Sequence, residues 1–170
     1  IDDYLGEFYR KDLKTGRITH DQAVRLLDNF FTIIETQCGR DTRVIIGGMG
    51  REHEKSADEF AMLVMDVLEV RREHFYPQIS LRYYKEMNQD IYDRALRILG
   101  SGSTFPMLYN DDVNVPAVMR AMDVPKKAAE QYSFFGCGEY MLAVQSIGTP
   151  NTALNVAKVL GLVLHDGINP

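Results

Sequence analysis

The sequence is poor in the features that mark several large classes of protein. Its 170 residues include two cysteines, no tryptophan, and fewer lysines and arginines (19) than aspartates and glutamates (24). Two distant cysteines do not make a disulfide framework, and they favour a reducing, cytoplasmic compartment. No apolar run approaches the ~20 residues of a membrane span. A net charge of −5 argues against nucleic acid as a partner, because phosphate binding needs a basic face.

Ligand motifs for metals and phosphates are also missing. The four histidines are scattered without ligand spacing and no Cys-x-x-Cys occurs, so we expect no metal site. Gly47-Gly48-Met49-Gly50 follows an expected strand, where phosphates often bind, but Lys55-Ser56 lacks the glycine that precedes lysine in a P-loop. We interpret the glycines as a turn and expect no cofactor-binding site within the chain.

The composition is that of an ordinary globular domain, with 45% hydrophobic and 25% charged residues. No repeat, proline-rich linker or charge block divides the chain, so residues 1–170 are predicted to form a single domain. The chain opens on Ile1-Asp2-Asp3-Tyr4, which is not a cationic signal peptide. We therefore expect it to begin inside a longer protein, and the domain to be a partial one.

Hydrophobic periodicity predicts helices that alternate with short strands. Thr19 and Gln22 form a capping-box pattern, and Ser56 and Asn151 are expected helix caps. Arg71-Arg72 is interpreted as a solvated helix face. The expected helices cover about 4–16, 19–39, 56–68, 88–99, 115–122, 126–132 and 152–164, and the strands 43–46, 79–84, 105–109 and a fourth near 134–135. This order indicates an α/β fold with largely parallel strands.

One segment differs from the rest in its chemistry, Phe134-Phe135-Gly136-Cys137-Gly138-Glu139-Tyr140. The flanking glycines let the backbone make a tight, exposed turn. In an extended segment, residues two apart share a side, so Cys137 and Glu139 could face one substrate. The alternative is a structural cysteine in a glycine-rich turn, with Glu139 in solvent. Cys38 ends an amphipathic helix and is predicted to be buried and structural.

Four segments of the chain resemble the glycyl radical enzymes, the family of pyruvate formate-lyase and related dehydratases, decarboxylases and lyases. They are Tyr9–Leu13 with Gly16–Thr19, Phe105–Asp112, the Gly-Cys-x-Glu loop at Phe135–Glu139, and Asn155–Gly167. The resemblance implies about half of a ten-stranded α/β barrel with the cysteine loop at its centre. It implies that Cys137 becomes a thiyl radical and that Glu139 acts as general base, the two catalytic residues.

The resemblance also implies partners that the chain does not carry. In this family a glycine near the C-terminus, in an Arg-Val-x-Gly motif, stores the radical, which a radical S-adenosylmethionine activase installs. The one Arg-Val pair here is Arg43-Val44, followed by Ile45-Ile46, so the motif is absent and the isolated chain is expected to be inactive. We expect a small polar metabolite as substrate, an activase that contacts the missing glycyl radical domain, and a parent compatible with a homodimer.

The sequence departs from some branches of that family. Pyruvate formate-lyase has two adjacent cysteines where this chain has one, which disfavours acyl transfer to coenzyme A. Pro150-Asn151 stand where the diol dehydratases place an aspartate, and Gly138 and Tyr140 replace the more usual valine and proline. We therefore predict a lyase that cleaves a C–C or C–heteroatom bond. The alternatives are an acyltransferase, a polar thiol enzyme with Cys137 as nucleophile, and a non-catalytic barrel module.

Overall fold

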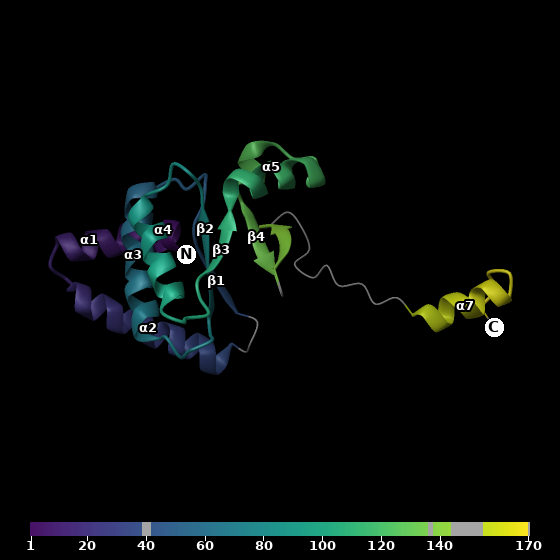
Figure 1. The fold of residues 1–170 in the computed structure, drawn as a ribbon, viewed down its shortest axis with the longest axis horizontal. Helices are drawn as coiled ribbons and strands as arrows, with labels where there is room; N and C mark the ends of the chain where they lie inside the picture. The colour runs from purple at the N-terminus through teal and green to yellow at the C-terminus, as the bar shows by residue number, and fades with distance from the viewer. Residues whose placement is uncertain (39–41, 136–137, 144–154, 170) are drawn as a thin grey trace.

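The computed structural model describes residues 1–170 except 39–41, 136–137, 144–154 and 170, and it has a mixed α/β fold (Figure 1). The helices are α1 (Asp2–Lys14), α2 (His20–Gln37), α3 (Glu54–Val70), α4 (Gln89–Gly100), α5 (Asp111–Met122), α6 (Lys126–Ala129) and α7 (Val156–Leu164). The strands are β1 (Arg43–Gly47), β2 (Gln78–Tyr83), β3 (Met107–Asn110), β4 (Tyr132–Phe135) and β5 (Glu139–Leu142). Within the described residues, no helix combines the length and the apolar character that crossing a membrane requires.

Three of the strands form a parallel sheet in the order β1-β2-β3. Helix α3 connects β1 to β2 and helix α4 connects β2 to β3, as crossover helices do between parallel neighbours. The register places Arg43 beside Gln78, and Arg82 beside both Gly47 and Tyr109. The prediction of an α/β fold with largely parallel strands is therefore confirmed.

The two faces of this sheet differ in chemistry, because successive side chains of a strand point to opposite sides. One face carries apolar residues packed with helices α1 to α4 in the main core: Val44, Ile46, Ile79 and Leu81. The opposite face, here called the hairpin face, carries Arg43, Ile45, Gln78, Arg82 and Tyr109. Three charged or amide side chains thus stand on one side of a sheet whose other side is apolar.

The hairpin face is covered by an antiparallel hairpin of β4 and β5, which pairs Tyr132 with Leu142 and Phe135 with Glu139. A second apolar cluster joins the hairpin to helices α5 and α6, and partly buried Ile45 and Tyr109 of the sheet pack against it. Its buried members are Val115, Val118, Ala129, Tyr132, Phe134 and Leu142. The expected strand near 134–135 is present, but its antiparallel partner was not predicted.

Helix starts follow the sequence in part. Thr19 and Gln22 form the predicted capping box, and Asn88 caps α4 by accepting a bond from the Asp90 N–H. The prediction for Ser56 was wrong, because α3 begins two residues earlier and the Ser56 hydroxyl donates to the carbonyl of His53. Helix α7 is capped by Asn155, while Asn151 lies outside the described residues.

The interpretation of Arg71 as part of a solvated face was also wrong. Its side chain is buried and binds Asp28 at 2.8 Å and Glu35 at 2.6 Å, both on α2. A buried guanidinium needs such partners, and these come from a helix far away in the sequence. Arg72 is exposed, as expected.

Candidate active site

One of the two predicted catalytic residues, Glu139, begins the second strand of the hairpin. Cys137 lies outside the described residues, so its position on a loop facing a concave site remains a prediction. Its neighbour Gly138 has φ +116°, a backbone conformation that favours glycine, and leads directly into β5. Glu139 is the first residue of β5 and pairs with Phe135 across the hairpin. Of the predicted catalytic pair, the structure therefore places Glu139.

The hairpin runs along the hairpin face from one end of the sheet toward the other. At its base, Tyr132 contacts Arg82 near the carboxyl ends of the strands. Further along, the ring of Phe134 stacks on Tyr109 with centroids 3.6 Å apart. At the tip, a Cβ built on Gly138 would lie 3.3 Å from the Tyr109 hydroxyl. The Gly138 end of the hairpin therefore lies against Tyr109, on the hairpin face of the sheet.

A buried ion pair anchors the hairpin base. Asp111 has no exposed surface, and it accepts bonds from Arg82 through Nε at 3.0 Å and Nη2 at 2.7 Å. The Tyr132 hydroxyl donates to the same carboxylate at 2.5 Å, and the Met49 N–H donates at 2.8 Å. Burial raises the pKa of Tyr132 far above its usual value, so the phenol stays a donor. This carboxylate is fully used in holding the site together and is not available as a base.

The glycines after β1 make room for this anchor. A Cβ at Gly48 would lie 2.9 Å from Cζ of Arg82, and one at Gly47 would lie 2.4 Å from the Arg82 carbonyl oxygen. Both glycines also have positive φ. The segment acts as the glycine turn that the sequence indicated, and its particular role is the close approach of Arg82.

Glu139 has an unusual environment for a carboxylate. The side chain is partly buried, and its Oε2 atom has no exposed surface and no hydrogen-bond partner among the described residues. Buried polar atoms are nearly always hydrogen-bonded, because an unpaired one costs free energy. An exception at this position is consistent with an atom that binds a substrate group. The alternative of Glu139 in bulk solvent is not what the structure shows.

A cationic group lies on the same face. Arg43 donates through Nη1 to the Tyr109 hydroxyl at 2.9 Å and through Nη2 to Oε1 of Gln78 at 2.8 Å. Its guanidinium also lies 5.9 Å from the centre of the Phe134 ring. Arg43 is therefore joined to the hairpin tip through Tyr109.

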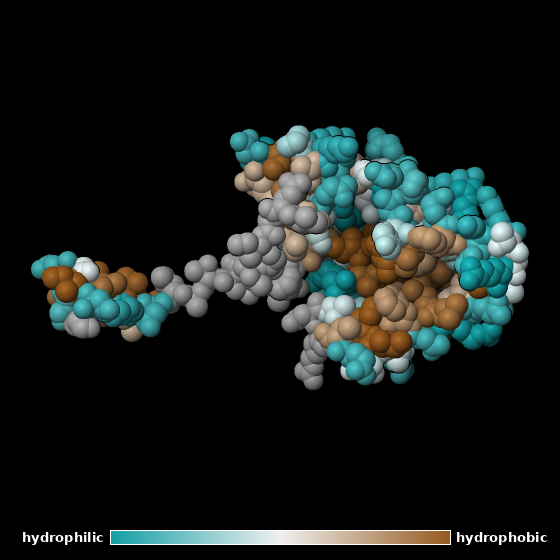
Figure 2. All heavy atoms as spheres, turned by 180° about the vertical axis from the view of Figure 1, so that it is seen from behind, coloured by the Kyte–Doolittle hydropathy of each residue, from teal (hydrophilic) through white to brown (hydrophobic). Residues whose placement is uncertain are grey.

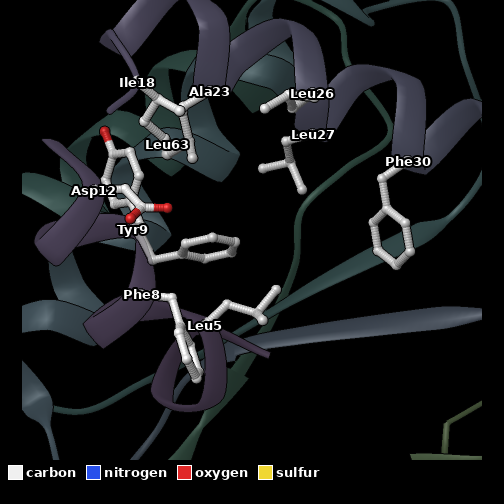
Figure 3. Close-up of a pocket in the computed structure, with 11 residues that line it drawn as sticks. Leu5, Phe8, Tyr9, Asp12, Ile18, Ala23, Leu26, Leu27, Phe30 and Leu63 are labelled. Carbon is white, nitrogen blue, oxygen red and sulfur yellow. The ribbon is translucent and has the colours of Figure 1, made fainter. Parts of the chain in front are cut away.

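An apolar groove opens elsewhere, on the side of α1 and α2 (Figures 2 and 3). It has a volume of about 290 Å³, and Leu5, Phe8, Leu26 and Phe30 are among its lining residues. Of the residues that line it, Asp12 and Tyr9 are polar. The groove belongs to the helical layer and does not include the hairpin residues, so it is not the site predicted from the sequence.

The expectation that Cys38 is buried was wrong. Cys38 is the C-terminal capping residue of α2 and is exposed. The apolar stripe of α2 ends at the buried Ile34, one turn earlier, so the helix end extends beyond the core.

Sequence reasoning missed Arg43, Arg82, Asp111 and Tyr132. Arg82 had a visible signal, since it is the one charged residue of strand β2. Asp111 was noticed only as part of an acidic turn after β3. Their pairing across 29 positions has no local signature.

The fold is that of an α/β protein in which a hairpin, with Glu139 at the start of its second strand, covers one face of a parallel sheet. The family model described as pyruvate formate lyase-like matches residues 1–170. The chain belongs to this family, and the resemblance to the glycyl radical enzymes is confirmed.

Curated relatives agree with this assignment. The chain is 28% identical to an isethionate sulfite-lyase of Nitratidesulfovibrio vulgaris, over 98% of this chain and 22% of that protein. It is 23% identical to a trans-4-hydroxy-L-proline dehydratase of Clostridioides difficile, over 100% of this chain and 23% of that protein. The chain therefore spans less than a quarter of the length of these relatives.

Solved structures show the same fold. The hydroxyproline dehydratase of Clostridioides difficile, with its substrate bound, matches with a TM-score of 0.68 at 22% identity, over 83% of this chain and 20% of that one. A glycyl radical enzyme from Archaeoglobus fulgidus matches with a TM-score of 0.66 at 23% identity, over 84% and 20%. The expected fold class, part of a glycyl radical enzyme barrel, is confirmed.

Proposed function

We propose that the intact protein is a glycyl radical lyase, and that residues 1–170 are one partial domain carrying its catalytic hairpin. The observation that carries this proposal is the buried Oε2 of Glu139, which has no hydrogen-bond partner among the described residues. Glu139 is the first residue of β5, two positions after Cys137 in the sequence. The relatives named as a sulfite-lyase and a dehydratase support the same class of reaction.

The reaction needs a hydrogen-atom acceptor and a base on one side of the substrate. A thiyl radical at Cys137 takes a hydrogen atom from a carbon that bears a hydroxyl or amine, so that an S–H bond forms and a C–H bond breaks. Glu139 takes the proton of that heteroatom, and the leaving group on the adjacent carbon departs with the bonding electron pair. The product radical then recovers a hydrogen atom from the Cys137 thiol, which restores the thiyl radical.

The surroundings of the tip suit this chemistry. The stacked rings of Phe134 and Tyr109 form an apolar wall beside it, and a water-poor pocket protects a radical. The Arg82–Asp111 ion pair anchors the Tyr132 end of the hairpin, which limits movement of the hairpin relative to the sheet. A glycyl radical stored outside these 170 residues would supply the radical to Cys137.

The partners follow from the same proposal. The parent requires a small-molecule substrate and an activase of the radical S-adenosylmethionine type, and it is compatible with a homodimer. Residues 1–170 alone are expected to be inactive, since they contain no Arg-Val-x-Gly motif.

The test compares two cysteine variants in the intact, activated parent. Cys137→Ser should abolish product formation, while Cys38→Ser, at an exposed helix end, should retain it. Both variants should still acquire the glycyl radical, measured by electron paramagnetic resonance, which shows that activation is intact. Equal turnover in the two variants, or full wild-type activity in air without activation, would contradict the radical mechanism and favour a polar thiol enzyme or a non-catalytic role.

A further inference from the structure

We infer that Arg43, Gln78 and Tyr109 form a subsite for an oxyanion carried by the substrate, beside the hairpin tip. The inference rests on the proposed function and deepens it, because it names the substrate class. That class is a small metabolite with a carboxylate, sulfonate or phosphate group near the carbon that reacts.

The first observation is the fixed orientation of the guanidinium. Arg43 and Gln78 are register partners at the start of β1 and β2, and Arg43 Nη2 donates to Gln78 Oε1 at 2.8 Å. Nη1 donates to the Tyr109 hydroxyl at 2.9 Å. Two bonds from two neighbouring strands hold the planar group in place before a ligand arrives, and such preorganisation reduces the entropy lost on binding.

The second observation is the distance from Tyr109 to Gly138, the residue before Glu139. The hydroxyl of Tyr109, which binds Arg43, lies 3.3 Å from the position of a Cβ on Gly138. Gly138 is bonded directly to Glu139, whose Oε2 lacks a partner among the described residues. A substrate group bound at the Gly138 end of the hairpin would therefore lie near a fixed positive charge.

The donors around the subsite match an oxyanion. A guanidinium presents its N–H groups in a rigid fork that suits carboxylate, sulfonate and phosphate oxygens. Because Tyr109 accepts a bond from Arg43, its own O–H is a donor for another oxygen. Gln78 accepts through Oε1 and keeps its amide N–H groups as donors. The three side chains together offer charge and several donors on one patch of the hairpin face.

The experiment measures binding and not turnover, so that its result is separate from that of the radical mechanism. The intact parent, not activated, is titrated calorimetrically with four compounds on one three-carbon diol skeleton. They are glycerol, glycerate, 2,3-dihydroxypropane-1-sulfonate and glycerol 3-phosphate. At least one anionic member should bind about 10- to 100-fold more tightly than glycerol, as expected for charge-assisted hydrogen bonds.

Variants then assign that preference to the subsite. Arg43→Met should remove the preference for the anion while leaving glycerol binding unchanged, and Arg43→Lys should retain part of it. Tyr109→Phe keeps the ring that stacks on Phe134 and should weaken the preference to a lesser degree. Arg25→Met, at an exposed arginine of α2, is the matched control and should have no effect.

The ratio of anion to glycerol affinity distinguishes the subsite from a structural role, because a merely destabilised protein loses both ligands alike. An unchanged ratio in Arg43→Met, or a parent that binds glycerol as tightly as all three anions, would overturn the proposal. Failure to bind any anionic member would overturn it too. None of these results would bear on whether Cys137 carries a radical.

Discussion

The hydroxyl of Tyr132 donates a hydrogen bond of 2.5 Å to Oδ1 of Asp111, which joins the first residue of the hairpin to the first residue of α5. The same carboxylate binds Arg82 at the end of β2. One buried charge thus ties together the sheet, a helix and the strand that leads to the predicted catalytic residues. Loss of the Asp111 charge should lower the stability of the protein and change the position of the hairpin on the sheet.

Asp111→Asn should therefore destabilise the protein strongly. Removing one partner of a buried ion pair leaves the other charge uncompensated and costs about 3–5 kcal/mol. The measurement is the thermal unfolding midpoint of the intact parent. Asp112→Asn is the matched control, because the neighbouring Asp112 is exposed and its bond to the Lys85 N–H survives the change. Similar small shifts in both variants would show that the buried pair does not anchor the hairpin.

Glu139→Gln should separate hydrogen abstraction from product formation. Glutamine keeps the size and polarity of the side chain but cannot accept the substrate proton, and a positioned general base contributes about 10²–10⁴-fold in rate. In the activated parent, deuterium exchange or a trapped substrate radical should persist while product formation falls by that factor. Exposed Glu52→Gln is the control and should turn over normally.

Two outcomes would revise the role of Glu139. Wild-type turnover in the glutamine variant would show that this residue is not the base. Complete loss of hydrogen abstraction would mean instead that Glu139 positions the substrate or shapes the loop around Cys137.

Cys38→Ser should have little effect on stability. Because Cys38 is exposed, the change should move the free energy of unfolding by no more than about 0.5 kcal/mol. Ala57→Ser provides the contrast, since it places a hydroxyl at a fully buried position of α3 and should cost about 1–3 kcal/mol. Thermal unfolding of the parent measures both. A loss at Cys38 as large as that at Ala57 would contradict its exposed position.

At alkaline pH, ionisation of Tyr84 should lower the free energy of unfolding. Burial, and then the hydrogen bond from its hydroxyl to Glu54, raise the pKa of Tyr84 to about 12 from 10.0. As pH rises, the tyrosine of the unfolded chain therefore loses its proton before that of the folded protein does. The contribution of Tyr84 to the free energy of unfolding is complete below pH 10 and is lost as pH rises to about 12. Tyr84→Phe should flatten the decline of the unfolding midpoint over this interval. Tyr4→Phe, at an exposed tyrosine, should leave the decline as it is.

Local patterns predicted the local structure well. The β-branched run at Val44-Ile45-Ile46 forms a strand, and the Thr19–Gln22 capping box forms as its residue types require. These features depend on neighbours in the sequence. The same holds for the turn at the end of β1, where Gly47, Gly48 and Gly50 adopt positive φ.

Features that depend on distant partners were not predictable in this way. Arg71 is buried because Asp28 and Glu35 lie across from it, 43 and 36 residues earlier. Strand β5 was missed because it pairs with β4, outside the main sheet, and because it begins with a charged residue, Glu139, which is not typical of a strand. The family resemblance predicted Cys137 and Glu139 as catalytic residues, but the hydrogen bond between Arg43 and Tyr109 depends on the register of strands far apart in the sequence.

Successive side chains of each strand point to opposite faces of the sheet, so alternate positions can be changed for different purposes. Positions 43 and 45 of β1, 78 and 82 of β2, and 109 of β3 face the hairpin, while their immediate neighbours in each strand pack against helices. Position 82 holds the buried ion pair with Asp111 and position 45 packs against the second apolar cluster, so a substitution library is best confined to 43, 78 and 109. On the proposed function, such a library would change which molecule is recognised and leave both apolar clusters intact. The same number of changes shifted by one residue would alter folding yield instead, so screening for new substrates and screening for expression can be carried out on separate sets of codons.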